Sequence, residues 1–204
     1  MAIRPRPGRM PLLRGRFEFN AQHPDVGEVD DAFDLEIDVP RSFPRELPVV
    51  IETGGRIPRT AHYHVNQLDG SLCLGSPLRL LLLLSEKPSL VGFAETCLIP
   101  YLFAISRKLR TGAPLPFGEL DHGAPGALAD YKTLFGVPTA ARALETLRLL
   151  GKKKRIANKL HCPCGCGLRL GKCSFRNRLP RFRALASRPW YRAQFQHMSR
   201  YHSS

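Results

Sequence analysis

The chain has 204 residues and a formal net charge of +14, and 43% of its residues are hydrophobic. This composition can form a buried core and excludes a globally disordered chain, and the length allows one domain with an appendage or two small domains. The unbroken leucine run Leu80–Leu84 is far too short to span a bilayer, and the basic N-terminus lacks the apolar stretch of a secretory signal. We therefore expect a soluble, cytoplasmic protein without membrane contacts.

The N-terminal part of the chain predicts antiparallel strands. Residues 1–10 contain three arginines and are expected to form a loose basic arm. Residues 12–21 alternate weakly between apolar and polar side chains, and residues 31–39 alternate cleanly, as half-buried antiparallel strands do. A third short strand is expected at 48–53. Residues 54–71 have no periodicity and many turn formers, which predicts a long loop.

Two helices are expected after this loop. Apolar residues recur at helical spacing over residues 89–110, with Ser89 as the N-cap and Gly112 as the stop. Pro100 should kink or divide this helix. A second helix is expected over residues 138–150, with its proline in the first turn. Strands followed by helices indicate an α+β fold with an antiparallel meander.

Residues 30–110 carry a series of short motifs in a fixed order. The motifs are Phe43-Pro44, Pro48, His64-Val65-Asn66, Asp69-Gly70-Ser71 and Cys73-Leu74. In order and spacing they resemble the core of the ubiquitin-conjugating enzyme family (the UBC fold). The resemblance implies a UBC-like antiparallel β-meander with C-terminal helices over residues 11–150, in which Cys73 is the thiol that accepts an acyl group.

The chain also departs from the family pattern. Val65 replaces the proline of the family's tripeptide, and Asn66 lies seven positions before Cys73, one fewer than is usual. The sequence leaves no room for the long N-terminal helix that contacts the activating enzyme in eukaryotic members. These features look like the divergent bacterial members, several of which belong to anti-phage defence operons that encode ubiquitin-like conjugation.

The residue types around Cys73 also fit thioester chemistry by themselves. A thiol that exchanges acyl groups must be accessible and able to ionise from an ordinary pKa of about 8.5, and a polar turn before Cys73 favours access. Acyl transfer passes through an oxyanion, which a side-chain amide stabilises by roughly 2.7–4 kcal/mol. Asn66 is the candidate donor, with a purely structural role as the alternative. His64 is expected to brace the loop through a backbone hydrogen bond.

Other interpretations stay open at this loop. A free cysteine is often a small buried hydrophobe, and this is the alternative for Cys73. Cys97 lies within an apolar helical pattern and is expected in the core. No general base stands out, although Glu86, Asp121 and His122 follow Cys73 in segments expected to be loops and could approach it.

Four cysteines gather within twelve residues near the C-terminus. They are Cys162, Cys164, Cys166 and Cys173. In a cytosolic chain such a cluster favours metal binding over disulfides. The segment resembles the SEC-C type zinc motif, which has its fourth ligand where this chain has Ser174, so Cys166 or His161 would complete the set. Four such ligands make a closed, structural Zn²⁺ site, and Gly165 and Gly167 allow sharp turns between them. A reduced, metal-free loop is the alternative.

Residues 151–204 are expected to form a small, zinc-stabilised basic module. Only Glu145 is acidic beyond Asp130, and the tail interleaves arginines with aromatic residues. Such a tail can bind single-stranded nucleic acid through charge and stacking, or an acidic protein. It can equally pack amphipathic helices with the aromatics inward. The pattern favours packing or docking to a protein partner.

The motifs together predict a conjugating enzyme for a ubiquitin-like protein. Cys73 would accept the C-terminal acyl group of that protein as a thioester from an adenylating, activating enzyme, and would pass it to an amine on a target protein. The alternative is a non-catalytic UBC-like adaptor that binds a ubiquitin-like protein and uses its basic tail to hold nucleic acid.

Overall fold

The computed structural model of the protein describes residues 1–6, 9–24, 26–115 and 123–202. The chain divides into two compact units. The first comprises Met1–Gly75 and Leu83–Glu119, and the second comprises Ser76–Leu82 and Leu120–Ser204. The division at Glu119 precedes residue 150, the end expected for the first domain, because the helices of residues 123–150 pack with the C-terminal helices.

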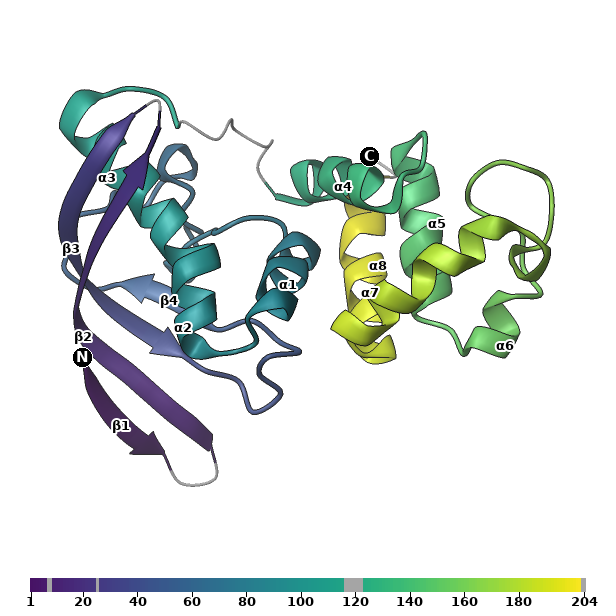
Figure 1. Ribbon diagram of the computed structural model, residues 1–204, viewed down its shortest axis with the longest axis horizontal. Helices are drawn as coiled ribbons and strands as arrows, with labels where there is room; N and C mark the ends of the chain where they lie inside the picture. Colours follow the sequence, from purple (N-terminus) through teal and green to yellow (C-terminus); the bar gives the residue numbers. More distant parts are fainter. Residues whose placement is uncertain (7–8, 25, 116–122, 203–204) are drawn as a thin grey trace. The chain divides into compact units, whose positions relative to one another are not determined.

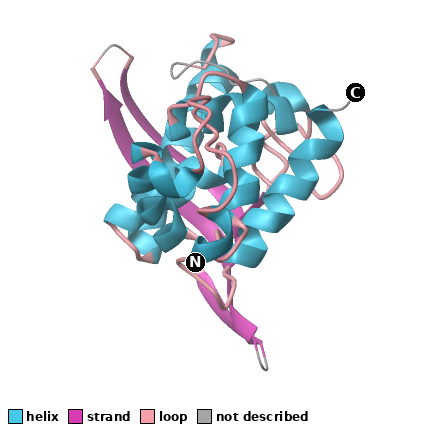
Figure 2. Ribbon diagram, turned by 90° about the vertical axis from the view of Figure 1, so that its right-hand side faces the viewer, coloured by secondary structure: helices cyan, strands magenta, loops and turns pink. Residues whose placement is uncertain are grey.

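The first unit is built on a four-stranded antiparallel sheet in the order β1-β2-β3-β4. The strands are β1 (Ala2–Arg6), β2 (Arg9–His23), β3 (Gly27–Asp38) and β4 (Val49–Glu52). Figures 1 and 2 show β2 and β3 as a long curved hairpin. The predicted α+β fold with an antiparallel meander is confirmed. Strand β1 lies where a loose arm was expected, because Ile3 pairs with Leu13 and extends the sheet by one edge strand.

The core of this unit lies on one face of the sheet. Phe33, Leu35 and Ile37 of β3 are buried there, whereas Asp34 between them is exposed, as the period of two in a strand requires. Helix α3 (Ile99–Thr111) packs against β2 and β3 on the buried face (Figure 1). The alternation seen in the sequence therefore sets which face of β3 the helix covers.

Helix α2 (Leu90–Phe93) leads into α3 through a π-helical turn at Ala94–Leu98. Ser89 Oγ accepts a hydrogen bond from the Gly92 N–H at 3.0 Å, which confirms the predicted N-cap. Gly112, with φ of 69°, ends the helix as expected. Pro100 has no N–H and its ring crowds the preceding turn. The widened turn just before Pro100 is the division that the sequence predicted.

The same helical span, Leu90–Thr111, is long and apolar enough to cross a bilayer. It is the one such span among the described residues. Polar residues interrupt it, so the sequence contains no long unbroken apolar run there. Within the fold, 56% of its most apolar stretch is buried. Burial of this kind is typical of a core helix that packs on a sheet.

The second unit is helical and shares α1 (Pro77–Glu86) with the first, because Ser76–Leu82 cluster with the C-terminal half. Its remaining helices are α4 (Gly123–Phe135), α5 (Ala140–Leu150), α6 (Lys154–Ala157), α7 (Leu179–Leu185) and α8 (Arg188–His202). Helix α8 packs against α4 and α5, and α7 packs against α5. The predicted helix over 138–150 is confirmed as α5, although Pro138 precedes the N-cap Thr139.

Three aromatic side chains of the tail point into this helical unit, whereas Tyr201 is 59% exposed. Phe175, Phe182 and Tyr191 are all buried, and the Phe182 ring meets the Phe135 ring edge to face at 4.9 Å. The Tyr191 hydroxyl donates a hydrogen bond to the Phe182 carbonyl. The arginines and aromatics of the tail therefore belong to packed helices, as the favoured interpretation of the sequence predicted.

Candidate functional site

Cys73 follows a short hairpin that is attached to the edge of the sheet. The Leu72 N–H donates to the Val50 carbonyl of β4 at 2.8 Å, and Leu72 also pairs with Val65 across the hairpin. The Cys73 N–H donates to the His64 carbonyl at 2.8 Å. His64 thus braces the backbone of Cys73 directly, through its own main chain.

The turn of this hairpin is held by its own side chains. Asn66 Oδ1 accepts from the Leu68 N–H at 3.1 Å, and the Asn66 N–H donates to the Ser71 carbonyl at 2.8 Å. Asp69 Oδ1 accepts from the Ser71 hydroxyl at 2.7 Å and from the Ser71 N–H at 2.9 Å, and these bonds lower the pKa of Asp69. The Asn66 side chain is exposed, and its oxygen has a structural role while the amide nitrogen keeps two N–H donors.

The thiol of Cys73 is exposed at the surface. Surrounding protein atoms still desolvate it and raise the pKa of Cys73, and an N–H from Gly75 acts in the opposite direction. Tyr101 of α3 is buried near this thiol and donates to the Tyr63 carbonyl at 2.8 Å. Burial, followed by the negative charges of Cys73 and Glu52, raises the pKa of Tyr101, which therefore stays protonated.

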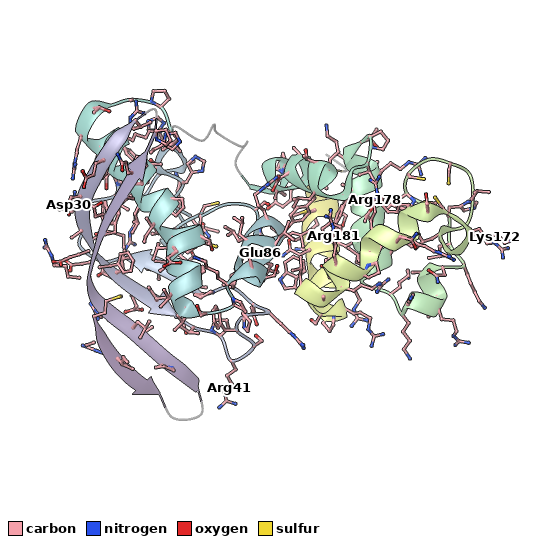
Figure 3. All side chains as sticks on the ribbon, in the orientation of Figure 1. Asp30, Arg41, Glu86, Lys172, Arg178 and Arg181 are labelled. Carbon is pink, nitrogen blue, oxygen red and sulfur yellow. The ribbon has the colours of Figure 1, made fainter. Side chains whose placement is uncertain are left out.

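Other residues considered near Cys73 lie in varied positions. Glu86 is exposed in the last turn of α1 rather than in a loop (Figure 3), and Cys97 is buried, as expected. Asp121 and His122 lie outside the described residues. Sequence reasoning missed Tyr101, because its place in a helical apolar pattern marks it only as a core residue.

The four clustered cysteines come together in a second hairpin. All four sulfur atoms, of Cys162, Cys164, Cys166 and Cys173, lie within 4.8 Å of one another. The Cys162 and Cys164 sulfurs are 3.2 Å apart, and the Cys164 and Cys173 sulfurs are 3.6 Å apart. These distances exclude a disulfide, whose sulfurs are about 2.05 Å apart. The edge of about 3.8 Å that a tetrahedron with metal–sulfur bonds of about 2.3 Å requires is slightly longer than both distances and shorter than the 4.8 Å within which all four sulfurs lie.

Backbone groups around the hairpin suit thiolate ligands. The Phe175 N–H donates to Cys173 Sγ and lowers the pKa of Cys173 to about 7. Burial raises the pKa of Cys162, and the neighbouring sulfurs raise the pKa of Cys166, while backbone N–H groups of Cys164 and Leu168 act in the opposite direction. Such donors to ligand sulfurs are the outer-shell bonds that stabilise metal-bound thiolates. The four cysteines can therefore hold a metal ion.

The local sequence explains how three alternating cysteines converge. Gly165 and Gly167 have φ of 90° and 76°, so both adopt the left-handed turn that was expected of them. The Cys162 N–H donates to the Leu168 carbonyl at 2.9 Å and closes the hairpin. His161 is exposed and pairs with Arg169 through the backbone, and it is not part of the four-sulfur group.

A buried ionic network fixes the start of α1 to α4. Arg79 Nε donates to both carboxylate oxygens of Asp130, at 3.0 and 2.9 Å, and the Ser76 hydroxyl also donates to Asp130. The Leu78 N–H donates to the Tyr131 hydroxyl at 3.2 Å. Because these partners are more than 50 residues apart in sequence, no local pattern could have predicted them.

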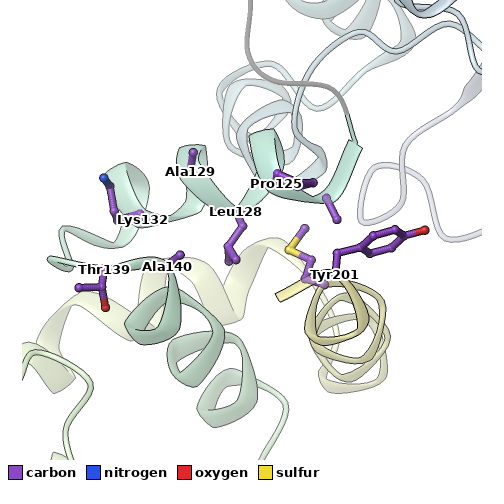
Figure 4. Close-up of a pocket in the computed structure, with 9 residues that line it drawn as sticks. Pro125, Leu128, Ala129, Lys132, Thr139, Ala140 and Tyr201 are labelled. Carbon is purple, nitrogen blue, oxygen red and sulfur yellow. The ribbon is translucent and has the colours of Figure 1, made fainter. Parts of the chain in front are cut away.

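One apolar hollow of about 250 Å³ lies in the helical unit (Figure 4). Leu128, Ala129 and Lys132 of α4 and Tyr201 of α8 are among the residues that line it. It contains no cluster of nucleophilic or acidic side chains, and none of the predicted site residues lines it. Its chemistry is that of an incompletely filled contact between helices.

Comparison of the chain with models of protein families, with curated proteins and with solved structures finds no match. Conclusions about its function therefore depend on the two sites described above.

Proposed function

We propose that the first unit is a conjugating domain for a ubiquitin-like protein. The observation that carries the proposal is an exposed cysteine held by a hairpin directly after an antiparallel meander, with Asn66 in the turn of that hairpin. The resemblance of the Phe-Pro, His-x-Asn and Gly-Ser-x-Cys motifs supports it. A cytoplasmic, bacterial anti-phage setting follows from that resemblance alone.

In this function Cys73 acts twice. Its thiolate attacks the activated C-terminal carbonyl of the ubiquitin-like protein on the activating enzyme, so that a new thioester forms and the bond to the activating enzyme breaks. A target amine then attacks this thioester, the C–N bond forms, Cys73 leaves as a thiolate and the amine proton passes to solvent. The Asn66 amide nitrogen would donate to the oxyanion of the second step, the transfer to the amine.

The rival function is a non-catalytic adaptor that binds the ubiquitin-like protein. One observation favours it: desolvation raises the pKa of Cys73, and the thiolate is the nucleophilic form. Of the three candidate bases, Glu86 is exposed at a helix end and the other two lie outside the described residues.

A loading assay separates the two functions. With ATP, an adenylating enzyme and its ubiquitin-like protein, the enzyme should form a conjugate that a reductant cleaves. Cys73→Ser should abolish it or give a slower, reductant-stable ester, whereas the buried control Cys97→Ser should load normally. A normal thioester on Cys73→Ser would exclude Cys73 as the acceptor. Binding of the ubiquitin-like protein without any conjugate in the wild type would establish the adaptor.

Asn66→Asp tests the oxyanion role without removing the turn. Aspartate keeps an acceptor for the Leu68 N–H but has no N–H to donate. Loading of Cys73 should stay within a few-fold, and transfer to an amine should slow by about a hundredfold. Asn66→Ala is the companion variant, because it removes both functions. Equal transfer rates for Asn66→Asp and the wild type would leave Asn66 with its structural role only.

We also propose that the metal in the cysteine hairpin is zinc, bound by Cys162, Cys164, Cys166 and Cys173. Four thiolates in tetrahedral reach of one ion are the ligand set of a structural zinc site. Bound there, zinc supplies no chemistry, because a four-ligand shell leaves no open position for water or substrate. Metal analysis of purified protein should find one zinc per chain.

A further inference from the structure

The net positive charge of the molecule comes from its helical unit. The first unit contains 13 lysines and arginines against 14 acidic residues, and the second contains 18 against 3. From Thr146 to the last residue the sequence has no aspartate or glutamate. The basic side chains in this stretch cannot be balanced by acidic neighbours along the chain.

Some of these basic residues have a structural task. Arg183 of α7 donates to the carbonyls of Leu149, Leu150 and Lys152 at 3.0, 3.1 and 3.0 Å, at the C-terminal end of α5. Arg181 donates to the Leu134 carbonyl at 3.0 Å, at the end of α4 (Figure 3). Cations at these ends satisfy the last carbonyls and favour the helix dipole. These arginines hold α7 against the helices that it caps.

A second group of basic side chains lies around the cysteine hairpin, and these side chains do not cap a helix end. All six are exposed, and none of them has an ion pair among the described residues. They form what we call the hairpin cationic surface: Lys153, Lys154, Arg155, Lys159, Arg169 and Lys172.

Backbone bonds place these side chains on neighbouring segments. The Leu170 N–H donates to the Leu160 carbonyl at 2.8 Å, and the Gly171 N–H donates to the Asn158 carbonyl at 3.0 Å. The segment that follows α6 therefore lies beside the returning strand of the hairpin, and Lys159 lies beside residues 169–172. Figure 3 shows Lys172 at the hairpin end of the unit, pointing outward.

We propose that the hairpin cationic surface binds the sugar–phosphate backbone of double-stranded nucleic acid without reading its sequence. Phosphate contacts by lysine and arginine supply nearly all of such non-specific binding. Binding of single strands usually adds base stacking on aromatic side chains. Residues 152–172 contain no phenylalanine, tyrosine or tryptophan, and Phe175 beyond them is buried. The surface thus offers charge without a stacking platform.

Protein and membrane partners fit this surface less well. The core of a protein interface is rich in aromatic and other apolar side chains, whereas interfaces with nucleic acid are more polar and more positive. Here only Ile156 and Leu168 are large, exposed and apolar. Helix α6 has only four residues, too few to present the apolar face of a membrane-surface helix.

A matched pair of double variants tests the proposal in the full-length protein. Lys154→Gln with Arg155→Gln removes one lysine and one arginine from the surface, and Lys132→Gln with Arg142→Gln removes the same charges elsewhere in the unit. Arg142 lies near the start of α5, about 12 Å along the helix from its last residue, Leu150. The probes are a 20-base-pair DNA duplex, the matching RNA duplex, a DNA single strand, poly-glutamate and vesicles containing phosphatidylserine.

Wild type should bind a duplex with log affinity that falls linearly with log salt. The Lys154/Arg155 variant should reduce that slope by about 2 and weaken binding by at least tenfold at 0.15 M salt, equally for two unrelated sequences. The Lys132/Arg142 variant should leave the slope unchanged. The DNA and RNA arms identify which duplex is preferred.

Several results would overturn the proposal. These are no duplex binding at 50 mM salt, equal effects of the two double variants, or stronger binding to the single strand, poly-glutamate or vesicles. A loss of bound metal in the Lys154/Arg155 variant without weaker duplex binding would show instead that these cations balance the net charge of the thiolate site. None of these measurements depends on Cys73.

Discussion

The two compact units differ in how their charged side chains are arranged. In the sheet unit, charges are paired: Asp31 accepts hydrogen bonds from Arg56 at 2.9 Å and lies 3.2 Å from Arg110, and Lys87 pairs with Glu95 at 2.9 Å. In the helical unit, the described side-chain carboxylates are those of Asp130 and Glu145. Each forms an ion pair with one arginine. The other cations there cap helix ends or face solvent.

This difference indicates what each unit depends on. A unit with balanced charges needs ionised carboxylates, and should weaken in acid. A unit with an excess of cations repels itself, and depends on packing and helix caps, and on the proposed metal, to stay compact. The following predictions test this contrast, from the largest effect to the smallest.

The metal should matter to the helical unit alone. Cys164→Ser with Cys173→Ser should release the proposed zinc and loosen the segment after Lys159, because metal binding in comparable small motifs contributes on the order of 10 kcal/mol to local folding. Limited proteolysis and metal analysis of the full chain check this. Cys97→Ser is the control and should keep both metal and resistance. If the strands β2 and β3 become equally sensitive to protease in the double variant, the two units are not independent in this respect.

The ion pair of the buried Asp130 should matter more than the ion pair of the more exposed Glu145. The Asp130 side chain is only 4% exposed although Arg79 is 43% exposed, and Asp130→Ala leaves the buried Ser76 hydroxyl without its acceptor, so it should cost about 2 kcal/mol of unfolding free energy. Glu145→Ala breaks an i,i+3 pair with Arg148 and should cost about 0.5 kcal/mol or less. Urea unfolding followed by hydrogen exchange of α4 peptides measures both. Equal costs would contradict the buried role of Asp130.

The features that could be predicted from the sequence are those whose pattern lies within a short segment of the chain. Strand β3 could be predicted because a period of two appears within the strand itself, and α5 because its N-cap Thr139 and apolar spacing are local. The cysteine cluster could be predicted for the same reason, because all four cysteines lie within one short segment. Local patterns of this kind also placed Cys73 in a loop after the strands.

Features that depend on distant residues could not be predicted. Helix α4 begins with Gly123, Pro125 and Gly126, which locally favour a turn, and it is helical because Leu128 and Tyr131 are buried in the helical core. The run of leucines in α1 is apolar at every position, so it shows no periodicity that would predict a helix rather than a strand. The contacts of Asp130 and of Tyr101 join segments far apart in the chain.

Acid should weaken the sheet unit first. Burial of Asp31 raises its pKa, but hydrogen bonds from Arg56 and the Ala32 N–H, together with the positive charge of Arg56, outweigh this, and the net effect lowers the pKa of Asp31. Because the folded pKa lies below the unfolded value of about 3.9, the stabilisation is present above about pH 4 and is lost as the pH falls further. Asp31→Asn should therefore cost about 2 kcal/mol at pH 7 and progressively less towards pH 2.

Hydrogen exchange at pH 7 and pH 3 distinguishes the two units in this test. In wild type, peptides of β3 should lose protection between the two values, and peptides of α5 should lose less. The Glu28→Gln variant is a suitable control, because Glu28 is an exposed carboxylate on the same strand. An Asp31→Asn variant as stable as wild type at pH 7 would remove this ion-pair group as the source of acid sensitivity.

The smallest expected effect concerns the thiols of the two units. Desolvation raises the pKa of Cys73, so alkylation by iodoacetamide at pH 7.5 should be slower than for the same peptide in denatured protein, and should accelerate as the pH rises towards the folded pKa. The hairpin cysteines should resist alkylation for a different reason: a bound metal would engage their sulfur lone pairs, and a chelator should expose them without changing the rate at Cys73. Mass spectrometry of each cysteine peptide over a pH series measures both. Should Cys73 react at neutral pH faster than the denatured control, its thiolate is stabilised by groups outside the described residues, and the adaptor function would lose the observation that favours it.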